Sequence, residues 1–357
     1  MNSAFDDTTI AFVTDTIVAE GGSGTGIDFD ACILYYLIVG SGIGGCFFLV
    51  GITGNAFTLA IMSKERKKSS TINSLFMLAI ADSCVLISYS YLIPVGIRKY
   101  VGGWFSGHNF NHIAFVYVKE AARVFNQVSA FITMLVTFQR YVSVCLPHRA
   151  KQLCSVSLVN KLTAASFLFS AIFYLPQFLY YTLEKNEFGR YYSVSRSFVA
   201  NQVFQVIYSA ILTLLISYVI PVSTLIFMCI RILRVMHQQG KLFQQSDERS
   251  RTRRDLTISS IAIVILFVVC QSFTYATRVL MWIYNPFYKY SRCGGVLQTY
   301  SFVPHIALMF NSAANFVIYI CFAKAFRKKL FGIFCKSSKV APMKESIEGR
   351  IFSVTTA

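Results

Sequence analysis

The chain has 357 residues, of which 55% are hydrophobic and only 14% are charged, and its formal net charge is +17. A soluble protein usually has about a quarter of its residues charged, so this composition indicates a membrane protein. The basic residues stand in short clusters between apolar runs, which is typical of loops that flank membrane spans and argues against a nucleic-acid partner.

The first thirty residues are acidic and contain no lysine or arginine. A secretory signal peptide begins with basic residues, so we do not expect one here. Residues 1–32 are predicted to form an acidic extracellular tail that the first membrane helix delivers outward.

Seven segments are long and apolar enough to cross the hydrocarbon layer, which takes about 20 residues in a helix. The second segment contains a single acid, Asp82, and the third carries Lys119, Glu120 and Arg123 in its first turns. The sequence therefore predicts an all-α fold, a seven-transmembrane-helix bundle over residues 33–322. The segments are 31–63, 69–97, 113–145, 162–183, 197–230, 256–277 and 293–323.

The basic residues predict the orientation of the bundle. Of the 33 lysines and arginines, 23 lie in the loops after the first, third and fifth spans or in the C-terminal segment. Cytoplasmic loops are enriched in these residues. We therefore expect the N-terminus outside and the C-terminus in the cytoplasm, at the plasma membrane.

The segment 323–335 follows the seventh span and has an amphipathic pattern. Phe322, Phe326, Leu330 and Phe334 recur at helical spacing, with basic residues between them. This pattern predicts a short amphipathic helix in the cytoplasmic interface, in contact with membrane lipid. Cys335 ends it as a candidate for palmitoylation, with a free thiol as the alternative. Residues 336–357 are predicted to be a disordered cytoplasmic tail.

Several short motifs stand in order on the predicted spans: Gly54-Asn55, residues 78–82, Arg140-Tyr141, Pro147, Pro221, Asn311-Ser312 and residues 315–319. Together they resemble the motifs of rhodopsin-like G-protein-coupled receptors, over roughly residues 33–335. Within that family, residues 137–147, residues 174–178 and Cys270-Gln271 look most like invertebrate FMRFamide-type neuropeptide receptors and their nematode relatives.

The resemblance implies a function in signalling rather than in catalysis. It implies a receptor that binds an extracellular neuropeptide and that acts through a heterotrimeric G protein, with arrestin as a further partner. The alternative within the class is a chemosensory receptor for a small, acidic molecule. A transporter or channel is a distant alternative, because only Asp82 lies deep in a span. The five scattered histidines offer no catalytic set.

Asp82 is the residue that most needs an explanation in a membrane span, because a charged side chain there is costly. The resemblance implies that four polar side chains surround Asp82 and that Na⁺ binds there as an allosteric ion. We expect no other cofactor. The alternative is a neutral, hydrogen-bonded carboxylic acid. The expected partners are Ser129, Asn311, Ser312 and Asn315.

The resemblance also assigns a signalling switch at the cytoplasmic end of the third span. Arg140 is expected to contact the G protein once the sixth helix moves outward. In the family an acid precedes this arginine, whereas here Gln139 does, so we expect a weaker resting-state restraint. The other switch residues are Tyr141, Tyr319 and Gln271, which replaces the usual tryptophan of the sixth helix.

Charged residues predict the ligand site at the outer end. The resemblance implies that Arg123 and Arg278 face one cavity, and two guanidiniums there favour a ligand with an acid or a C-terminal carbonyl. The alternative is that Glu120 pairs with Arg123 on the same helix face and leaves the site nearly neutral. The remaining expected site residues are His305 and Gln127.

The family's usual disulfide between the third helix and the second outer loop is missing, because Phe115 stands at the helix position and residues 184–196 contain no cysteine. Cys32 and Cys293 are the cysteines that fall in predicted outer segments. We predict that they pair, the alternatives being free thiols or an intermolecular bond.

Overall fold

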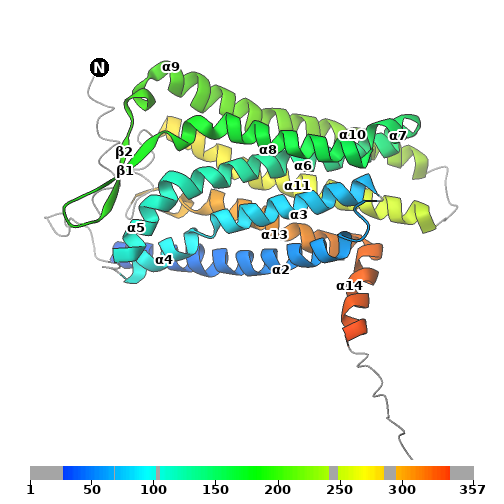
Figure 1. The fold of residues 1–357 in the computed structure, drawn as a ribbon, viewed down its shortest axis with the longest axis horizontal. Helices are drawn as coiled ribbons and strands as arrows, with labels where there is room; N and C mark the ends of the chain where they lie inside the picture. The colour runs from blue at the N-terminus through cyan, green and yellow to red at the C-terminus, as the bar shows by residue number, and fades with distance from the viewer. Residues whose placement is uncertain (1–26, 68, 102–104, 241–247, 285–294, 338–357) are drawn as a thin grey trace, which may run out of the picture.

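The computed structural model describes residues 27–337, except 68, 102–104, 241–247 and 285–294. Its helices lie side by side in one elongated bundle (Figure 1). Seven of them are long and apolar enough to cross a membrane, which confirms the predicted all-α bundle. These spans are Ala31–Met62, Ser70–Arg98, Ser106–Cys145, Val156–Phe178, Gln202–Gln238, Arg254–Thr277 and Gln298–Phe322.

The spans are built from several helical segments, some of which contain a π-helical stretch. The α-helices of the first four spans are α1 (Ile27–Tyr35), α2 (Gly44–Met62), α3 (Ser70–Tyr89), α4 (Leu92–Val101), α5 (Phe105–Ile113), α6 (Lys119–Cys145), the short α7 (Ala150–Leu153) and α8 (Val156–Phe178). The later ones are α9 (Gln202–Phe204), α10 (Ile220–Gly240), α11 (Glu248–Ile283), α13 (Val303–Phe322) and α14 (Lys324–Ser337). π-Helical stretches at Tyr36–Ile43, Ala114–Val118, Gln205–Leu212 and Leu215–Val219 continue the spans, and 3-10 turns lie at Pro147–Arg149, Ser197–Ala200 and Gln298–Tyr300.

Polar side chains define where several helices begin. The hydroxyl of Ser155 accepts a hydrogen bond from the backbone N–H of Leu158 at 3.2 Å, at the start of α8. Ser69 caps α3 and Asn201 caps α9 in the same way. Such caps satisfy N–H groups that the first helical turn leaves without a partner.

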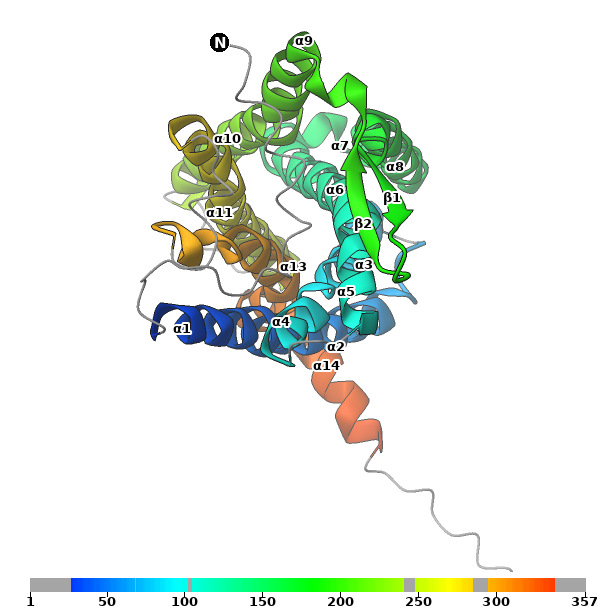
Figure 2. The same cartoon turned by 90° about the vertical axis from the view of Figure 1, so that its left-hand side faces the viewer.

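The two ends of the bundle differ. At one end β1 (Tyr181–Lys185) and β2 (Tyr191–Ser195) form an antiparallel hairpin, with Tyr181 opposite Ser195 and Lys185 opposite Tyr191 (Figure 1). At the other end α14 leaves the bundle at an angle (Figure 1). We call these the hairpin end and the α14 end. Figure 2 shows the bundle from the hairpin end, with α13 between α2 and α11.

The third span is longer than the sequence predicted. It begins with α5 at Phe105, so Lys119, Glu120 and Arg123 lie several turns inside it and not in its first turns. The fourth span ends earlier than predicted, at Phe178, because the apolar residues Tyr181 to Leu183 belong to strand β1. Both differences bring polar residues and the hairpin together at one end of the bundle.

Glycines let the first span approach its neighbours closely. A Cβ atom at Gly51 would lie 2.5 Å from Leu86 Cδ1 and 2.9 Å from the Cβ of Ala313. A Cβ at Gly54 would lie 2.7 Å from Cβ and Cγ of Phe316. Small residues at such contacts allow membrane helices to pack through their backbones.

Candidate functional site

A cluster of charged side chains lies inside the hairpin end of the bundle. Glu120 on α6 is only 2% exposed. Its carboxylate accepts a 2.9 Å hydrogen bond from Nη1 of Arg123 and lies 3.3 Å from Nζ of Lys119. Arg123 also donates to Oε1 of Gln177, which comes from α8. The two cations compensate the buried carboxylate, and Gln177 links the cluster to the fourth span.

Aromatic side chains surround this charged cluster. The Lys119 ammonium lies 3.9 Å from the centre of the Phe115 ring, which itself packs against Tyr181 of the hairpin at 5.0 Å. Burial raises the pKa of the Tyr181 hydroxyl, and the negative charge of Glu120 raises it further. The hairpin thus covers the cluster with an apolar face.

The structure places the other predicted ligand residues at different depths. His305 on α13 packs edge-on against Tyr89 at 5.7 Å and lies within electrostatic reach of Lys119 and Arg123. Gln127 is 1% exposed, and its amide is held by the Ile216 carbonyl at 3.3 Å and the Tyr174 hydroxyl at 3.4 Å. It therefore belongs to a buried network below the cluster. The side chain of Arg278 lies outside the described residues, so its role stays a prediction.

The predicted pair of Glu120 and Arg123 is present, and it changes the expected chemistry. The guanidinium is not a free cation, because the carboxylate already holds it. With Lys119, the cluster comprises two cations and one acid, and it offers hydrogen-bond donors beside an acceptor. Such a site suits a ligand group that both donates and accepts.

A second polar site lies around Asp82, near the middle of the bundle. The Asp82 side chain is fully buried on α3. One of its oxygens accepts hydrogen bonds from the hydroxyls of Ser129 at 2.7 Å and Ser312 at 3.2 Å. The other accepts one from the Asn315 amide at 2.6 Å. The structure therefore brings together three of the four expected partners in direct contact with the carboxylate.

The fourth expected partner, Asn311, is 5% exposed on the same helix, α13. Its carbonyl oxygen Oδ1 and that of Asn315 are buried, and neither has a hydrogen-bond partner among the described residues. The unsatisfied carbonyl oxygen of Asn315, beside the Asp82 carboxylate and two hydroxyl groups, is the ligand chemistry that a small hard cation prefers. The donor set around Asp82 thus fits Na⁺.

Between these two sites, a hydrogen bond links the third and sixth spans. Gln271 on α11 is 1% exposed, and its amide nitrogen donates to Oδ1 of Asn126 on α6 at 3.1 Å. At the next residue of α11, the hydroxyls of Ser272 and Tyr218 lie 2.9 Å apart and join the sixth and fifth spans. Gln271, a predicted switch residue, thus ties the sixth span to the helix that carries the charged cluster.

Arg140 lies near the α14 end of the third span and is 5% exposed. Its guanidinium donates a hydrogen bond to the hydroxyl of Thr71 on α3. Gln139 beside it is 1% exposed, and neither its amide nitrogen nor its oxygen has a partner among the described residues. The side chain at position 139 therefore does not restrain the arginine here, and a threonine hydroxyl from another helix contacts it instead.

The two predicted switch tyrosines take different positions. Tyr319 is 3% exposed on α13 and packs against Phe326 of α14 at 5.5 Å. Tyr141 is half-buried, and its ring lies 6.4 Å from Phe227 of α10. Tyr319 thus connects the end of the seventh span to α14, and Tyr141 packs toward the fifth span.

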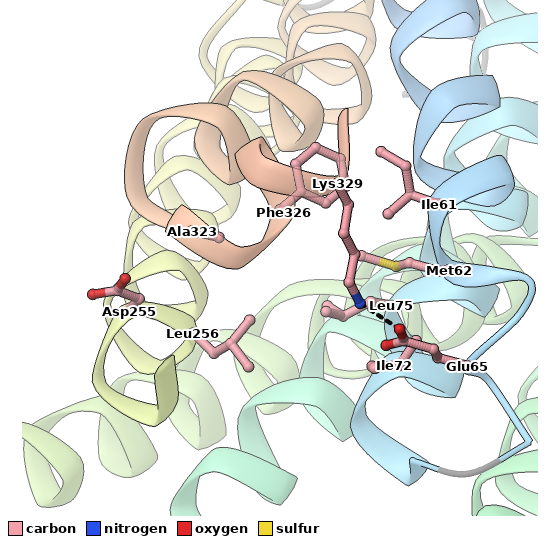
Figure 3. A pocket seen from close by; sticks show the side chains of 10 residues that line it. All are labelled: Ile61, Met62, Glu65, Ile72, Leu75, Asp255, Leu256, Ala323, Phe326 and Lys329. Atoms are coloured by element: carbon pink, nitrogen blue, oxygen red, sulfur yellow. Dashed lines mark hydrogen bonds and ion pairs between the residues drawn. The ribbon is translucent and has the colours of Figure 1, made fainter. Parts of the chain in front are cut away.

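A small cavity lies at the α14 end, between the first, second and sixth spans and α14 (Figure 3). Its wall is apolar except for three charged side chains. Lys329 of α14 and Glu65 of the first loop form an ion pair of 2.6 Å across it, and Asp255 stands at the other side (Figure 3). The pair is nearly half exposed, so it adds little to stability.

The predicted disulfide concerns the hairpin end. Cys32 is completely buried and disulfide-bonded. Its predicted partner, Cys293, lies outside the described residues, so the pairing itself stays a prediction. Cys335 is on α14, where its side chain lies outside the described part of the chain, and palmitoylation there also stays a prediction.

Sequence reasoning missed four residues of these sites, namely Lys119 as a partner of Glu120, Gln177, Asn126 and Thr71. Three of them are neutral polar residues inside apolar spans. A buried polar side chain in a membrane helix usually has a partner on a neighbouring helix. That rule marks such residues as candidates, but it does not say which helix supplies the partner.

Comparisons with known proteins agree with this arrangement. Residues 54–319, more than half of the chain, match the family described as 7 transmembrane receptor (rhodopsin family). The FMRFamide receptor of Drosophila melanogaster is 25% identical over 323 residues, which cover 87% of this chain and 55% of that protein. The FMRFamide peptide receptor frpr-18 of Caenorhabditis elegans is 20% identical over 290 residues, 79% of this chain and 66% of that protein.

A vertebrate relative is the galanin receptor 2a of Danio rerio, 24% identical over 294 residues, which cover 80% of this chain and 76% of that protein. The chain spans 55% and 66% of the lengths of the two FMRFamide receptors. The predicted resemblance to FMRFamide-type receptors is confirmed, at low identity. With seven helices able to cross a membrane and a family match over most of them, the chain belongs to the rhodopsin family of seven-transmembrane receptors.

Proposed function

We propose that this protein is a plasma-membrane receptor that binds an extracellular peptide at the hairpin end and activates a heterotrimeric G protein at the α14 end. The N-terminus then lies outside the cell and the C-terminus in the cytoplasm, as the basic loops favour. Arrestin is proposed as a further partner at the α14 end. The observation that carries the proposal is the charged cluster of Lys119, Glu120 and Arg123 inside the hairpin end.

The cluster favours a carboxamide as the ligand group that it binds. A carboxamide accepts hydrogen bonds through its oxygen and donates them through its nitrogen, so it matches Arg123 and Glu120 at once. A free carboxylate offers acceptors alone, and the Glu120 charge opposes it. The FMRFamide receptors among the relatives support an amidated peptide as the ligand.

A small acidic molecule is the second candidate ligand. The cluster holds two cations and a single acid, and Arg278 stands on α11 of the sixth span. This excess of positive charge favours an anion if the ligand contacts Lys119 rather than Glu120. A chemosensory receptor would use the site in this way.

The experiment that tests the proposal compares each peptide as its C-terminal amide and its free acid. The receptor is expressed in cells that report G-protein activation, and a panel of short aromatic peptides is applied. Arg123→Gln and Glu120→Gln should each lower the potency of the amide by about tenfold or more, about 1.4 kcal/mol. Arg278→Gln is included as the untested third position.

Lys185→Gln is the matched control, because Lys185 is a basic residue of the same end that is exposed on the hairpin. Its potency should stay unchanged at equal surface expression. A receptor that responds better to the free acids, and that keeps this response in Glu120→Gln, would support the second candidate instead. Unchanged potency in both Arg123→Gln and Glu120→Gln would reject the cluster as the ligand site.

We further propose that Na⁺ binds at Asp82 and favours the resting state. The ion would be held by the carboxylate with oxygens of Ser129, Ser312 and the two asparagines. A ligand shifts the equilibrium between two conformational states only when it binds one of them more tightly than the other. Agonist affinity should therefore be lower in sodium than in a large inert cation, and Asp82→Asn should remove this difference. An equal sodium effect in wild type and Asp82→Asn would contradict the proposal.

A further inference from the structure

A long apolar groove lies on the membrane-facing side of the bundle, between the first, sixth and seventh spans. Its volume is about 630 Å³, within the range of sites that hold a small molecule. Cys46, Phe47 and Val50 of α2 line one wall, and residues of α11 line the other. The remaining lining residues are Ala262, Ile265, Leu266, Val269, Phe310, Ala313, Ala314, Val317 and Ile318.

Small residues create this groove. Ala313 and Ala314 form its floor on α13, where they are 4% and 9% exposed. Larger side chains stand at its rims, such as Val50 at 54% and Ile265 at 61% exposed. The helix α13 is thus recessed between α2 and α11 (Figure 2). The opposite side of α13 carries Asn311, Ser312 and Asn315, so the floor of the groove is the back of the Asp82 site.

The groove extends from near the α14 end to beyond the middle of the bundle, since Cys46 lies sixteen residues before Met62, the last residue of the first span. Ile318 lies four residues before Phe322, the last residue of the seventh span, and Phe310 lies twelve residues before it. At 1.5 Å per residue these positions are about 6 Å and 18 Å from the span's end. Half of a hydrocarbon core of about 30 Å is about 15 Å. The floor residues Ala313 and Ala314 lie between these two positions, so an acyl chain of the leaflet that borders α14 can reach them.

The side chains that line the groove are apolar apart from the Cys46 thiol, so they offer a water molecule too few hydrogen-bond partners. A bilayer surrounds this face, which makes an acyl chain its natural occupant. Basic side chains stand beyond the groove at the same end: Lys324 and Lys328 are exposed on α14, and Arg254 is exposed at the start of the sixth span. Such cations attract anionic headgroups at the membrane surface. A sterol has no charge for them to bind.

We propose that this groove is a binding site for an anionic phospholipid of the leaflet next to α14. One acyl chain lies on Ala313 and Ala314 between the first and sixth spans, and the headgroup contacts Lys324, Lys328 and Arg254. The bound chain fills the space between the sixth span and its neighbours. The site is separate from the ligand cluster and needs neither agonist nor G protein.

The experiment is native mass spectrometry of the full-length receptor after reconstitution in vesicles of equal phosphatidylglycerol and phosphatidylcholine. The wild type should retain phosphatidylglycerol in preference to phosphatidylcholine. Ala262→Leu and Val50→Phe fill the groove from opposite walls and should each reduce retention by about fivefold or more. Val50 is more than half exposed, so its substitution needs no repacking of the core. Ala165→Leu is the matched control, because Ala165 is exposed on α8, away from the groove.

A second set of variants tests the headgroup contact. Lys324→Gln with Lys328→Gln should lower the preference for phosphatidylglycerol by about tenfold while a phospholipid is still retained. Lys161→Gln, a single exposed lysine on α8, should leave the preference unchanged. Equal retention by wild type and both filling variants overturns the proposal. So does retention of a sterol in place of the phospholipid when the vesicles contain both, or a dimer that the filling variants abolish.

Discussion

Gln139 is a buried amide without a hydrogen-bond partner among the described residues, and it stands next to a buried arginine. A buried polar group without a partner is costly, which makes this position a weak point of the structure. The Thr71 hydroxyl accepts a hydrogen bond from Arg140 here. A neutral hydroxyl attracts a guanidinium less strongly than a carboxylate does.

We predict measurable ligand-independent signalling that Gln139→Asp lowers. A carboxylate at position 139 can form an ion pair with Arg140 in the resting state. A pair that contributes about 1 kcal/mol shifts the equilibrium between the active and resting states about fivefold toward the resting state. Thr71→Ala should act in the opposite direction and raise basal output. The measurement is G-protein activation without agonist, at equal surface expression of each variant.

Ser83→Ala is the control for the threonine. Ser83 lies on the same helix, but its hydroxyl binds the Ala79 carbonyl of that helix at 2.7 Å. Its substitution should leave basal output unchanged. Basal output that stays equal or rises in Gln139→Asp would show that contacts of the sixth span already hold the receptor at rest.

Single residues also show what the sequence could reveal about the sites. Asp82 was predictable, because an acid in an otherwise apolar span stands out against its neighbours. Its partners came from the family resemblance. The bonds of Gln271 to Asn126 and of Arg140 to Thr71 were not predicted. Each depends on how two helices are rotated about their axes relative to one another, and this rotation cannot be predicted from a single sequence.

At the scale of elements, the apolar runs predicted all seven spans, because hydrocarbon thickness imposes their length. The hairpin of β1 and β2 was not predicted. Its strands have five residues each, and the apolar start of β1 continues the apolar run of the fourth span. The turn residue Gly189, with a positive φ of 73°, is the local signal that could have indicated it.

The contact between the first and seventh spans depends on a glycine, and this gives an element-scale prediction. Gly54→Ala should destabilise the receptor by about 1–3 kcal/mol, because the new Cβ would lie 2.7 Å from Cβ and Cγ of Phe316. Phe316 packs in turn against Phe57 at 6.1 Å and Phe326 at 6.0 Å. Thermal unfolding of the purified receptor in one detergent measures the effect.

Gly45→Ala provides the comparison, because it lies on the same helix α2 and its Cβ would meet no atom within 4 Å. Alanine should be neutral or stabilising there, by up to about 1 kcal/mol. If both substitutions lower the melting temperature equally, backbone effects in α2, and not the contact with Phe316, explain the loss.

Considered as a whole, the molecule places its polar contacts in series along the third span. The charged cluster at Glu120, the bond of Asn126 to Gln271, the bond of Ser129 to Asp82 and the contact of Arg140 with Thr71 follow one another on α6. They extend over 20 residues, about 30 Å of helix. The bonds of Ser129 and Arg140 join α6 to α3, and the bond of Asn126 joins it to α11. A shift of the third span therefore reaches the second and sixth spans through hydrogen bonds.

The disulfide of Cys32 also concerns the whole molecule, because a bond to Cys293 would close a loop that contains most of the chain. Seven other cysteines of the described part are free, and Cys335 is on α14 at the opposite end of the bundle. We predict that Cys293→Ser and Cys32→Ser each lower the melting temperature under non-reducing conditions. Loss of a native disulfide typically costs about 2–5 kcal/mol.

The double variant tests whether the two cysteines bond to each other. If they do, Cys32→Ser with Cys293→Ser should be no less stable than either single variant, because both changes remove the same bond. Cys46→Ser, at an exposed free thiol of the first span, should leave the melting temperature unchanged. A reducing agent should bring the wild type down to the level of the variants. Additive losses in the double variant, or a wild type that reduction does not affect, would contradict the pairing of Cys32 with Cys293.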